Sequence, residues 1–282
     1  MDISEIIEQL IGNGIIDHYP KGFKRLTGGT TSRLYLIEGK EQYVVKLNEP
    51  KVIEEEAYFL EFYKTQSLFP KLLYVDPLNR YMVYSFIPGS TNYHAGNKRE
   101  VLVRLVQKVI HTYKPAMKMD QWGWKEEPVD SWQAFLLERV MEANETVKSY
   151  ITEEDFHTVL KLVHSSNRTR YSNQPYLLHG DCGFHNFIFN EHKLYGVIDP
   201  LPVLGDPIYD FIYAFCSTPE DLTRETIDEV VEKSIFHNRA RKILYEEVVI
   251  VLYCRLDACI RHHPEDLDTY LKAWSYWMNQ IC

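Results

Sequence analysis

The chain lacks the cysteine pattern of a disulfide scaffold or a structural zinc site. No two of its five cysteines have the Cys-x-x-Cys spacing: they are Cys182, Cys216, Cys254, Cys259 and Cys282. An odd, scattered set of thiols indicates the reducing cytoplasm. No apolar stretch approaches the roughly twenty residues of a membrane-spanning helix. The first residues begin an amphipathic helix without a basic segment, so we expect neither a secretory signal nor a membrane partner.

Acidic residues outnumber basic ones, and this excess is distributed unevenly along the chain. The 282 residues carry a net charge of −9, with 15 basic and 26 acidic residues in 121–282 but 16 and 14 in 1–120. A division after residue 87 reduces the contrast, giving −2 for residues 1–87 and −7 for residues 88–282. Because an acidic field repels nucleic acid and attracts cations, we expect no nucleic-acid partner and a cationic ligand.

The most informative stretch of the chain is the segment 178–210. Its triplet His-Gly-Asp ends at Asp181, Asn186 follows five residues later, and Asp199 follows thirteen residues after that. Short apolar runs on both sides of a polar turn predict a hairpin that brings Asn186 and Asp199 together. A carboxylate that accepts a hydroxyl proton, with oxygen ligands for Mg²⁺ on nucleotide phosphates, is the equipment of phosphoryl transfer.

This segment resembles the aminoglycoside phosphotransferase family of protein-kinase-like small-molecule kinases, and weakly its hygromycin-type branch. His-Gly-Asp-x-x-x-x-Asn is the family's catalytic loop, and the Ile-Asp-Pro around Asp199 stands where protein kinases have Asp-Phe-Gly. The resemblance implies that Asp181 is the catalytic carboxylate and that Asn186 and Asp199 are metal ligands. It also implies that Asp206 and Asp210 hold loops by hydrogen bonds.

The first 87 residues contain the elements that the resemblance requires of a nucleotide-binding lobe. A β-branched strand carries Lys46, which by the resemblance pairs with the α- and β-phosphates. Its partner is expected to be a glutamate on the next helix, predicted over residues 51–66. The family's Glu-Ala-x-x-Leu pattern begins at Glu56, so we expect Glu56 rather than Glu54 or Glu55 to make the pair.

Two further segments are candidates for nucleotide contact. Glycine and hydroxyl residues can bring backbone and side-chain donors close to phosphates, and the candidates are Gly28, Gly29, Thr30 and Ser32. On local grounds a plain hairpin turn explains these residues nearly as well. The strand 81–84 then leads into a stretch that resembles the family's hinge. There the carbonyl of Ser85 and the amide of Ile87 would bind adenine.

The pattern of the whole chain predicts an α+β, bilobal, protein-kinase-like fold. We expect a small, mostly antiparallel N-terminal lobe with one key helix over residues 1–87, and a larger, mainly helical lobe over residues 88–282. In the second lobe only the catalytic strands should interrupt the helices. The apolar periodicity predicts helices over 98–113, 131–150, 153–164, 206–216, 224–236, 242–261 and 265–280.

Other residues have structural explanations. We expect His179 to fix its loop by a hydrogen bond to the backbone, and His185 to pack in the loop or reach solvent. Cys182 is expected to be a buried, unreactive thiol, because no neighbouring cation would lower its pKa. The tryptophan clusters at 122–124 and 274–277 are expected in the core.

Three functions are compatible with these patterns. The leading one is an O-phosphotransferase that uses ATP or GTP with Mg²⁺ and phosphorylates a hydroxyl of a small molecule. A metal-dependent hydrolase would instead use His179, Asp181, His185 and Asp199 as ligands, and would have no need of Lys46. A catalytically inactive nucleotide-binding module would lack the base or a metal ligand, and none is missing.

The acceptor is predicted from charge together with the resemblance to the aminoglycoside phosphotransferase family. Acidic residues on helices beside the active site would attract a polycation, with Asp257, Glu138 and Glu142 as candidates. We therefore expect an aminoglycoside-type antibiotic first, and an amino alcohol, a sugar or an amino acid second. For any single acid, a solvated acidic surface is the simpler explanation.

Overall fold

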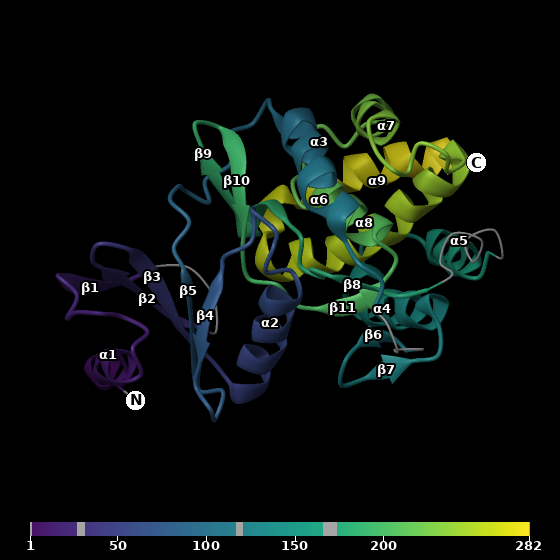
Figure 1. Cartoon of the computed structure of the whole chain (residues 1–282). Helices are drawn as coiled ribbons and strands as arrows, with labels where there is room; N and C mark the ends of the chain where they lie inside the picture. The colour runs from purple at the N-terminus through teal and green to yellow at the C-terminus, as the bar shows by residue number, and fades with distance from the viewer. Residues whose placement is uncertain (1, 27–31, 117–120, 166–173, 282) are drawn as a thin grey trace.

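The structure, a computed structural model, describes residues 2–26, 32–116, 121–165 and 174–281. The predicted phosphate-loop residues Gly28, Gly29 and Thr30 lie outside the described residues. Within the described ranges, no helix is long and apolar enough to cross a membrane. Figure 1 shows a small part rich in strands, which holds the N-terminus, beside a larger part made mainly of helices.

The N-terminal part is built on a five-stranded antiparallel sheet with strand order β1-β2-β3-β5-β4. Its strands are β1 (Gly22–Arg25), β2 (Arg33–Glu38), β3 (Gln42–Leu47), β4 (Leu72–Val75) and β5 (Tyr81–Ser85). Its helices are α1 (Ile3–Gly12) and α2 (Pro50–Phe62). A capping box between Asp2 and Glu5 starts α1. The predicted amphipathic N-terminal helix and antiparallel sheet are therefore present.

The two helices cover opposite faces of this sheet. Successive side chains of a strand point to opposite faces, so alternate residues enter different cores. Val45 and Val83 pack with the apolar residues of α1, whereas Val44 and Met82 pack with those of α2. Lys46 is two residues from Val44, and this spacing places it on the face that α2 covers.

The larger part contains all of the remaining elements that the structure describes. Its helices and 3₁₀ turns are α3 (Lys98–Lys108), η1 (Ile110–Thr112), α4 (Trp132–Val147), α5 (Glu153–Val163), η2 (Phe184–Asn186), α6 (Ile208–Cys216), α7 (Arg224–Glu232), α8 (Arg241–His262), η3 (Pro264–Asp266) and α9 (Leu267–Ile281). Its strands are β6 (Trp122–Trp124), β7 (Pro128–Val129), β8 (Tyr176–Leu178), β9 (Phe187–Asn190), β10 (Lys193–Val197) and β11 (Val203–Gly205).

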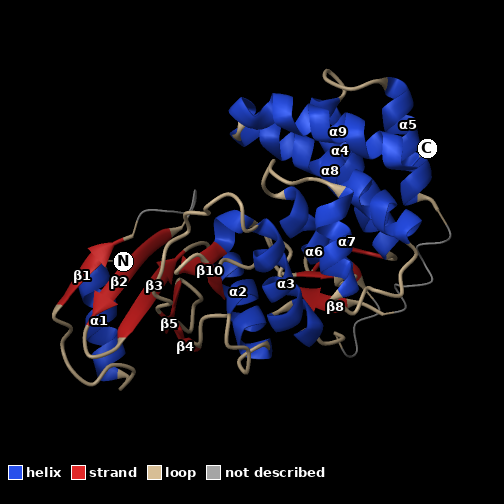
Figure 2. Cartoon of the chain, turned by 90° about the horizontal axis from the view of Figure 1, so that it is seen from above, coloured by secondary structure: helices blue, strands red, loops and turns tan. Residues whose placement is uncertain are grey.

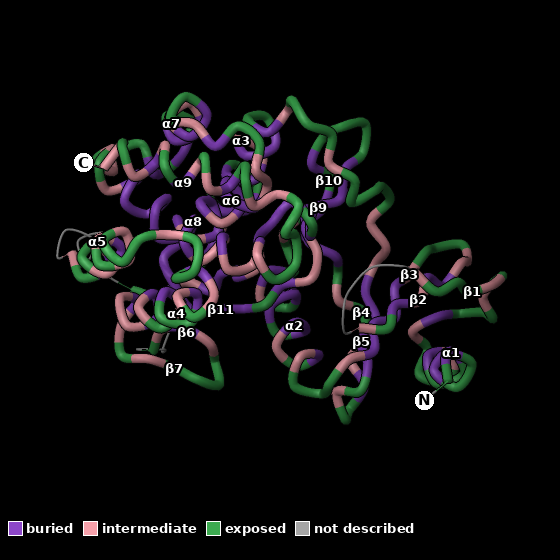
Figure 3. Tube along the Cα trace, turned by 180° about the vertical axis from the view of Figure 1, so that it is seen from behind, coloured by how far each residue is buried: buried purple, intermediate pink, exposed green. Residues whose placement is uncertain are grey.

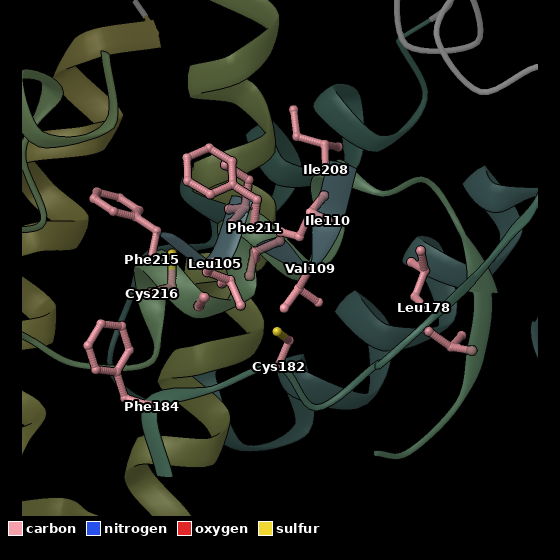
Figure 4. Packing of buried hydrophobic residues seen from close by; sticks show 14 of the residues in the cluster. Leu105, Val109, Ile110, Leu178, Cys182, Phe184, Ile208, Phe211, Phe215 and Cys216 are labelled. Carbon is pink, nitrogen blue, oxygen red and sulfur yellow. The ribbon is translucent and has the colours of Figure 1, made fainter. Parts of the chain in front are cut away.

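Helix α8 is the centre of the larger part. It packs against α4, α6 and α9, and Figure 2 shows α4, α8 and α9 gathered on the side away from the N-terminal sheet. Figure 3 shows buried segments running through α6 and α8. In Figure 4, Phe211 and Phe215 of α6 lie near Leu105 of α3, with Cys182 of the catalytic loop among the apolar side chains. Asp181, the neighbour of Cys182, is thus attached to a packed core.

The prediction that only the catalytic strands interrupt these helices was wrong. A four-stranded antiparallel sheet, β7-β6-β11-β8, includes two short strands that precede α4. Gly123 of β6 has a φ of 83°, and the strand has only three residues. Such a segment is too short to show the alternation of apolar and polar residues that identifies a strand. Its partner strand β11 lies far away in the sequence, so local patterns do not reveal the pairing. Trp122 and Trp124 are accordingly half-buried, while Trp274 and Trp277 lie in the core as predicted.

Candidate active site

The loop between β8 and β9 carries Asp181, and a close backbone approach fixes its path. Gly180 has a φ of 78°, and a Cβ atom there would lie 1.9 Å from the carbonyl oxygen of Leu201. The amide of Leu201 donates to the carbonyl of His179 at 2.8 Å. The segment before Asp181 therefore packs backbone to backbone on the segment after Asp199. Only glycine fits at position 180 without displacing one of the two.

His179 has the structural role that its sequence context predicts. Its ring is fully buried beside Phe59 and Phe69, and Nε2 lies 3.0 Å from the carbonyl oxygen of Ile198. Burial lowers the pKa of His179 to about 4, so the ring is neutral near pH 7. A neutral ring donates from Nε2 to the Ile198 carbonyl. This contact ties the catalytic loop to the residue before Asp199.

Asp210, on α6, holds the same loop between β8 and β9 through its carboxylate. Its carboxylate accepts hydrogen bonds from the backbone amides of His179 at 2.8 Å and Gly180 at 3.0 Å, and from the Tyr113 hydroxyl at 2.6 Å. Burial raises the pKa of Asp210 to about 6, although these donors favour the charged form. The predicted structural role of Asp210 is confirmed. Asp206 likewise accepts from the amide of Ile208, at the start of α6.

Asp181 is the centre of a hydrogen-bond network. One carboxylate oxygen accepts from the Tyr213 hydroxyl at 2.6 Å. The other accepts from the amide nitrogen of Asn186 at 2.9 Å and lies 3.2 Å from Nε2 of His185. Burial alone would raise the pKa of Asp181, but His185 and Tyr213 hold that pKa well below its usual range. The side chain is ionised at neutral pH and remains 31% exposed, so an incoming hydroxyl can reach it.

Sequence reasoning missed two of these partners. His185 was expected to pack in the loop or reach solvent; half of its side chain is exposed, but the ring also meets Asp181. A Cβ atom on Gly183 would lie 2.5 Å from this ring, so a glycine there makes room for it. Tyr213 comes from α6, and nothing in its local pattern points to Asp181. One feature of the sequence could have indicated this contact. Tyr213 follows Asp210 by three residues, so both side chains lie on the same face of α6, the helix whose Asp210 holds the catalytic loop.

Asn186 and Asp199 flank the open end of the β9–β10 hairpin. The amide of Ile198 donates to the carbonyl of Asn186 at 2.9 Å, which keeps the two positions side by side. The side-chain nitrogen of Asn186 donates to the backbone carbonyl and the carboxylate of Asp181, both at 2.9 Å. The side-chain oxygen of Asn186 has no partner among the described residues. One amide oxygen and one carboxylate fit a hard cation that keeps waters and phosphate oxygens as its other ligands.

Lys46 reaches both Glu56 of α2 and the carboxylate of Asp199. Its Nζ lies 2.5 Å from Glu56 and 3.1 Å from Asp199. Lys46 is 4% exposed and Glu56 is 2% exposed. Burial would lower the pKa of Lys46, but the two carboxylates outweigh it and raise that pKa, so the lysine stays charged. The predicted contact between Lys46 and Glu56 is confirmed, whereas Glu54 pairs with Lys125 on the surface.

The remaining predicted nucleotide-binding residues that the structure describes lie next to the ends of inner strands of the same sheet. Ser85 ends β5, where its amide and hydroxyl bond to Lys71 of the neighbouring segment. The amide of Ile87 has no hydrogen-bond partner within the described ranges, and the side chain of Ile87 rests on Gly196 of β10. The hydroxyl of Ser32 accepts from the side-chain amide of Asn48, after β3.

The hydrolase interpretation does not fit these contacts. His179 directs Nε2 to a backbone carbonyl and lies against the rings of Phe59 and Phe69. Over the parts of the chain that the structure describes, no group of three or more histidine, cysteine, aspartate or glutamate side chains is arranged to hold a metal ion. Cys182 is buried, and burial raises the pKa of its thiol well above its usual value, as expected for an unreactive cysteine.

A protein-family model described as the phosphotransferase enzyme family matches residues 22–244 of the chain. No curated protein matches the chain at a significant level.

Solved structures match over almost the whole chain. A putative fructosamine-3-kinase from Haemophilus somnus has a TM-score of 0.66 at 18% identity, covering 98% of this chain and 96% of the other. A choline kinase from Cryptosporidium parvum has a TM-score of 0.63 at 13% identity, covering 99% and 95%. The streptomycin–ATP complex of the aminoglycoside phosphotransferase APH(2")-IIa has a TM-score of 0.61 at 18% identity, covering 98% and 96%. At these identities the likeness shows the fold, and the predicted protein-kinase-like fold is confirmed.

Proposed function

Because the chain belongs to the phosphotransferase enzyme family, we propose that it transfers the γ-phosphoryl group of a nucleotide to a hydroxyl of a small molecule. The observation that carries this proposal is the pair of contacts Lys46–Asp199 and Asn186–Asp181, which the backbone hydrogen bond from Ile198 to Asn186 keeps side by side. These side chains come from both parts of the fold, with Lys46 on β3 and the other three in the larger part. Residues 1–87 would bind the nucleotide, and residues 88–282 would bind the acceptor.

Asp181 is the proposed catalytic residue. Tyr213, Asn186 and His185 fix the orientation of its carboxylate, and its low pKa keeps it ionised. It would orient the acceptor hydroxyl and take up its proton as the oxygen attacks the γ-phosphorus. In phosphoryl transfer the protein mainly positions the reactants and stabilises charge, so a fixed carboxylate beside the nucleophile is sufficient.

Asn186 and Asp199 would hold Mg²⁺, and Lys46 would contact the α- and β-phosphates. When bound, the metal would neutralise the negative charge that develops on the phosphate oxygens. Asp199 binds Lys46 through one carboxylate oxygen, and its side chain is 27% exposed, so the carboxylate stays partly accessible. Glu56 would hold Lys46 in position from the far side.

The nucleotide base would lie at the end of β5. There the carbonyl of Ser85 and the amide of Ile87 would bind it, while Ser32 would lie near the phosphates. Solved structures with this fold contain ATP, ADP or GDP, which supports a purine nucleotide as donor. Both ATP and GTP are therefore candidates.

The acceptor expected from the sequence is an aminoglycoside, with a smaller metabolite second. Structural neighbours in complex with streptomycin or gentamicin support the first, and neighbours named as fructosamine and choline kinases support the second. Of the acids predicted to attract a polycation, Asp257 lies 2.6 Å from Arg261, and Glu142 pairs with Arg139. These pairings reduce the negative charge that a polycation would meet.

The test is phosphoryl transfer from γ-labelled ATP and GTP, with Mg²⁺, to a panel of aminoglycosides, sugars, amino alcohols and hydroxy acids. Mass spectrometry would identify the product as a phosphomonoester of the acceptor. The proposal predicts nucleotide binding and label transfer to at least one acceptor. A protein that neither binds nor consumes either nucleotide would refute it.

A further inference from the structure

The two oxygens of the Asp181 carboxylate carry different numbers of hydrogen bonds. Oδ2 accepts from the side-chain nitrogen of Asn186 at 2.9 Å and lies 3.2 Å from Nε2 of His185. Oδ1 accepts from the Tyr213 hydroxyl at 2.6 Å. Each carboxylate oxygen has two lone pairs that can accept hydrogen bonds. Counting the partners within the described ranges, Oδ2 has both of its lone pairs occupied, whereas Oδ1 can accept one further hydrogen bond.

A hydroxyl that binds to Asp181 for reaction therefore binds to Oδ1. The side chain of Asp181 is 31% exposed, so a small molecule can reach it. In the proposed reaction this hydroxyl would give its proton to Oδ1 as its oxygen bonds the γ-phosphorus, while the bridging oxygen leaves with the nucleoside diphosphate. Two donors that share one oxygen lie about 4 Å apart. The Tyr213 hydroxyl is thus the direct neighbour of the reacting group.

The Tyr213 hydroxyl can accept a hydrogen bond from a bound molecule. Its proton is directed to Asp181, and burial together with the Asp181 charge raises the pKa of Tyr213 well above its usual value, so the phenol stays protonated. A hydroxyl that donates one hydrogen bond still has lone pairs with which to accept. In the part of the chain that the structure describes, no group donates to this oxygen, and the residue is half-buried rather than fully enclosed.

Oδ1 of Asp181 and the hydroxyl oxygen of Tyr213 form a pair of acceptors 2.6 Å apart. Two heteroatoms on neighbouring carbons lie about 3 Å apart in the staggered gauche arrangement, so two such donors can bind this pair side by side. A donor one carbon farther along has an additional rotatable bond, and fixing that bond costs entropy. The spacing of the two acceptors therefore favours donors in the 1,2 arrangement.

We propose that the acceptor carries a second hydrogen-bond donor, a hydroxyl or an amine, on the carbon next to its reacting hydroxyl, and that Tyr213 accepts from this donor. The inference rests on the proposed function and narrows its acceptor to 1,2-diols and to 1,2-amino alcohols whose nitrogen carries a hydrogen. Tyr213 is then a specificity-determining residue. A quaternary ammonium alcohol has no N–H group and gains nothing from this contact.

The test measures equilibrium binding of two isomer pairs to the protein saturated with Mg²⁺ and a non-hydrolysable analogue of the nucleotide that it binds. NMR titrations compare 1,2-propanediol with 1,3-propanediol, and 1-amino-2-propanol with 3-amino-1-propanol. The first pair tests a hydroxyl as the second donor, and the second pair tests an amine. We expect the 1,2 isomer of at least one pair to bind about threefold to tenfold more tightly than its partner, the net effect of one hydrogen bond. If neither 1,2 isomer binds more tightly than its partner, including the case in which no probe binds, the inference is overturned.

Variants connect the preference to the Tyr213 hydroxyl. Tyr213→Phe keeps the ring and removes the acceptor oxygen, so it should abolish the preference for the 1,2 isomer without changing nucleotide affinity. Tyr209→Phe is the matched control: Tyr209 lies one turn earlier on α6, and its ring packs on Trp132 at 5.3 Å. This control should keep the preference. A preference that survives in Tyr213→Phe contradicts the inference. Loss of nucleotide binding by the unmodified protein would instead contradict the proposed function.

Discussion

Replacing Glu56 by alanine tests the buried ion pair that joins the sheet to α2. Lys46 and Glu56 are almost completely buried and 2.5 Å apart, so the change removes the nearer of two carboxylate partners. Breaking a buried pair by removing one partner costs about 3–5 kcal/mol of unfolding free energy. Asp199 remains 3.1 Å from Lys46 and still compensates its charge. We therefore expect the free energy of unfolding to fall by about 3 kcal/mol, the lower end of that range.

The same change should weaken nucleotide use. Without Glu56, Lys46 is held only by Asp199, and its position at the phosphates becomes less defined. We expect KM for the nucleotide to rise roughly tenfold to a hundredfold, the effect of losing one charge-assisted hydrogen bond. A steady-state assay at saturating acceptor would measure it, with thermal unfolding to follow stability.

A double-mutant cycle separates coupling from independent roles. If Glu56 acts through Lys46, the Lys46→Ala, Glu56→Ala double variant should be little worse than the worse single variant. Glu54→Ala is the matched control: Glu54 lies on the same helix but is exposed and paired with Lys125. It should change stability by less than about 0.5 kcal/mol and leave KM unchanged. Fully additive losses at Lys46 and Glu56 would refute the pairing as the source of nucleotide positioning.

Three further predictions follow from the site geometry. Asp199→Ala should reduce nucleotide affinity more with Mg²⁺ than without it, because Asp199 is the carboxylate ligand; equal losses in calorimetric titrations would make it a structural residue. Gly180→Ala should destabilise the fold in chemical unfolding, because its Cβ would clash with the Leu201 carbonyl, and wild-type stability would contradict this close backbone approach. Tyr213→Phe should lower kcat by about tenfold with nucleotide KM unchanged, because one charged hydrogen bond to Asp181 is lost. An unaltered kcat would show that this bond does not position the base.

The sequence predicted the contacts of residues that lie within, or next to, a recognisable motif. The alternation along β3 places Lys46 on the face that α2 covers, and the Glu-Ala-x-x-Leu pattern of the family that the chain resembles selected Glu56 among three adjacent glutamates. The loop-holding role of Asp210, which the resemblance implied, and the backbone hydrogen bond of the His179 ring were likewise predicted.

Contacts that depend on helix packing were not predictable in this way. Tyr213 comes from α6, and its proximity to Asp181 follows from how that helix packs. The short strands of the β7-β6-β11-β8 sheet are defined by pairing between distant segments rather than by periodicity. Net charge was an incomplete guide to the acceptor, because it counts Asp257 and Glu142 as free although each is paired with an arginine.

The most direct test of the central claim is the turnover of Asp181→Asn. This change keeps the shape of the side chain and removes the proton acceptor. At saturating nucleotide and acceptor, kcat should fall by about 10²–10⁴, the usual contribution of a general base. The nucleotide dissociation constant and thermal stability should stay near those of the unmodified protein. A kcat close to normal would contradict the account, because phosphoryl transfer would then proceed without the carboxylate on which the proposed mechanism depends.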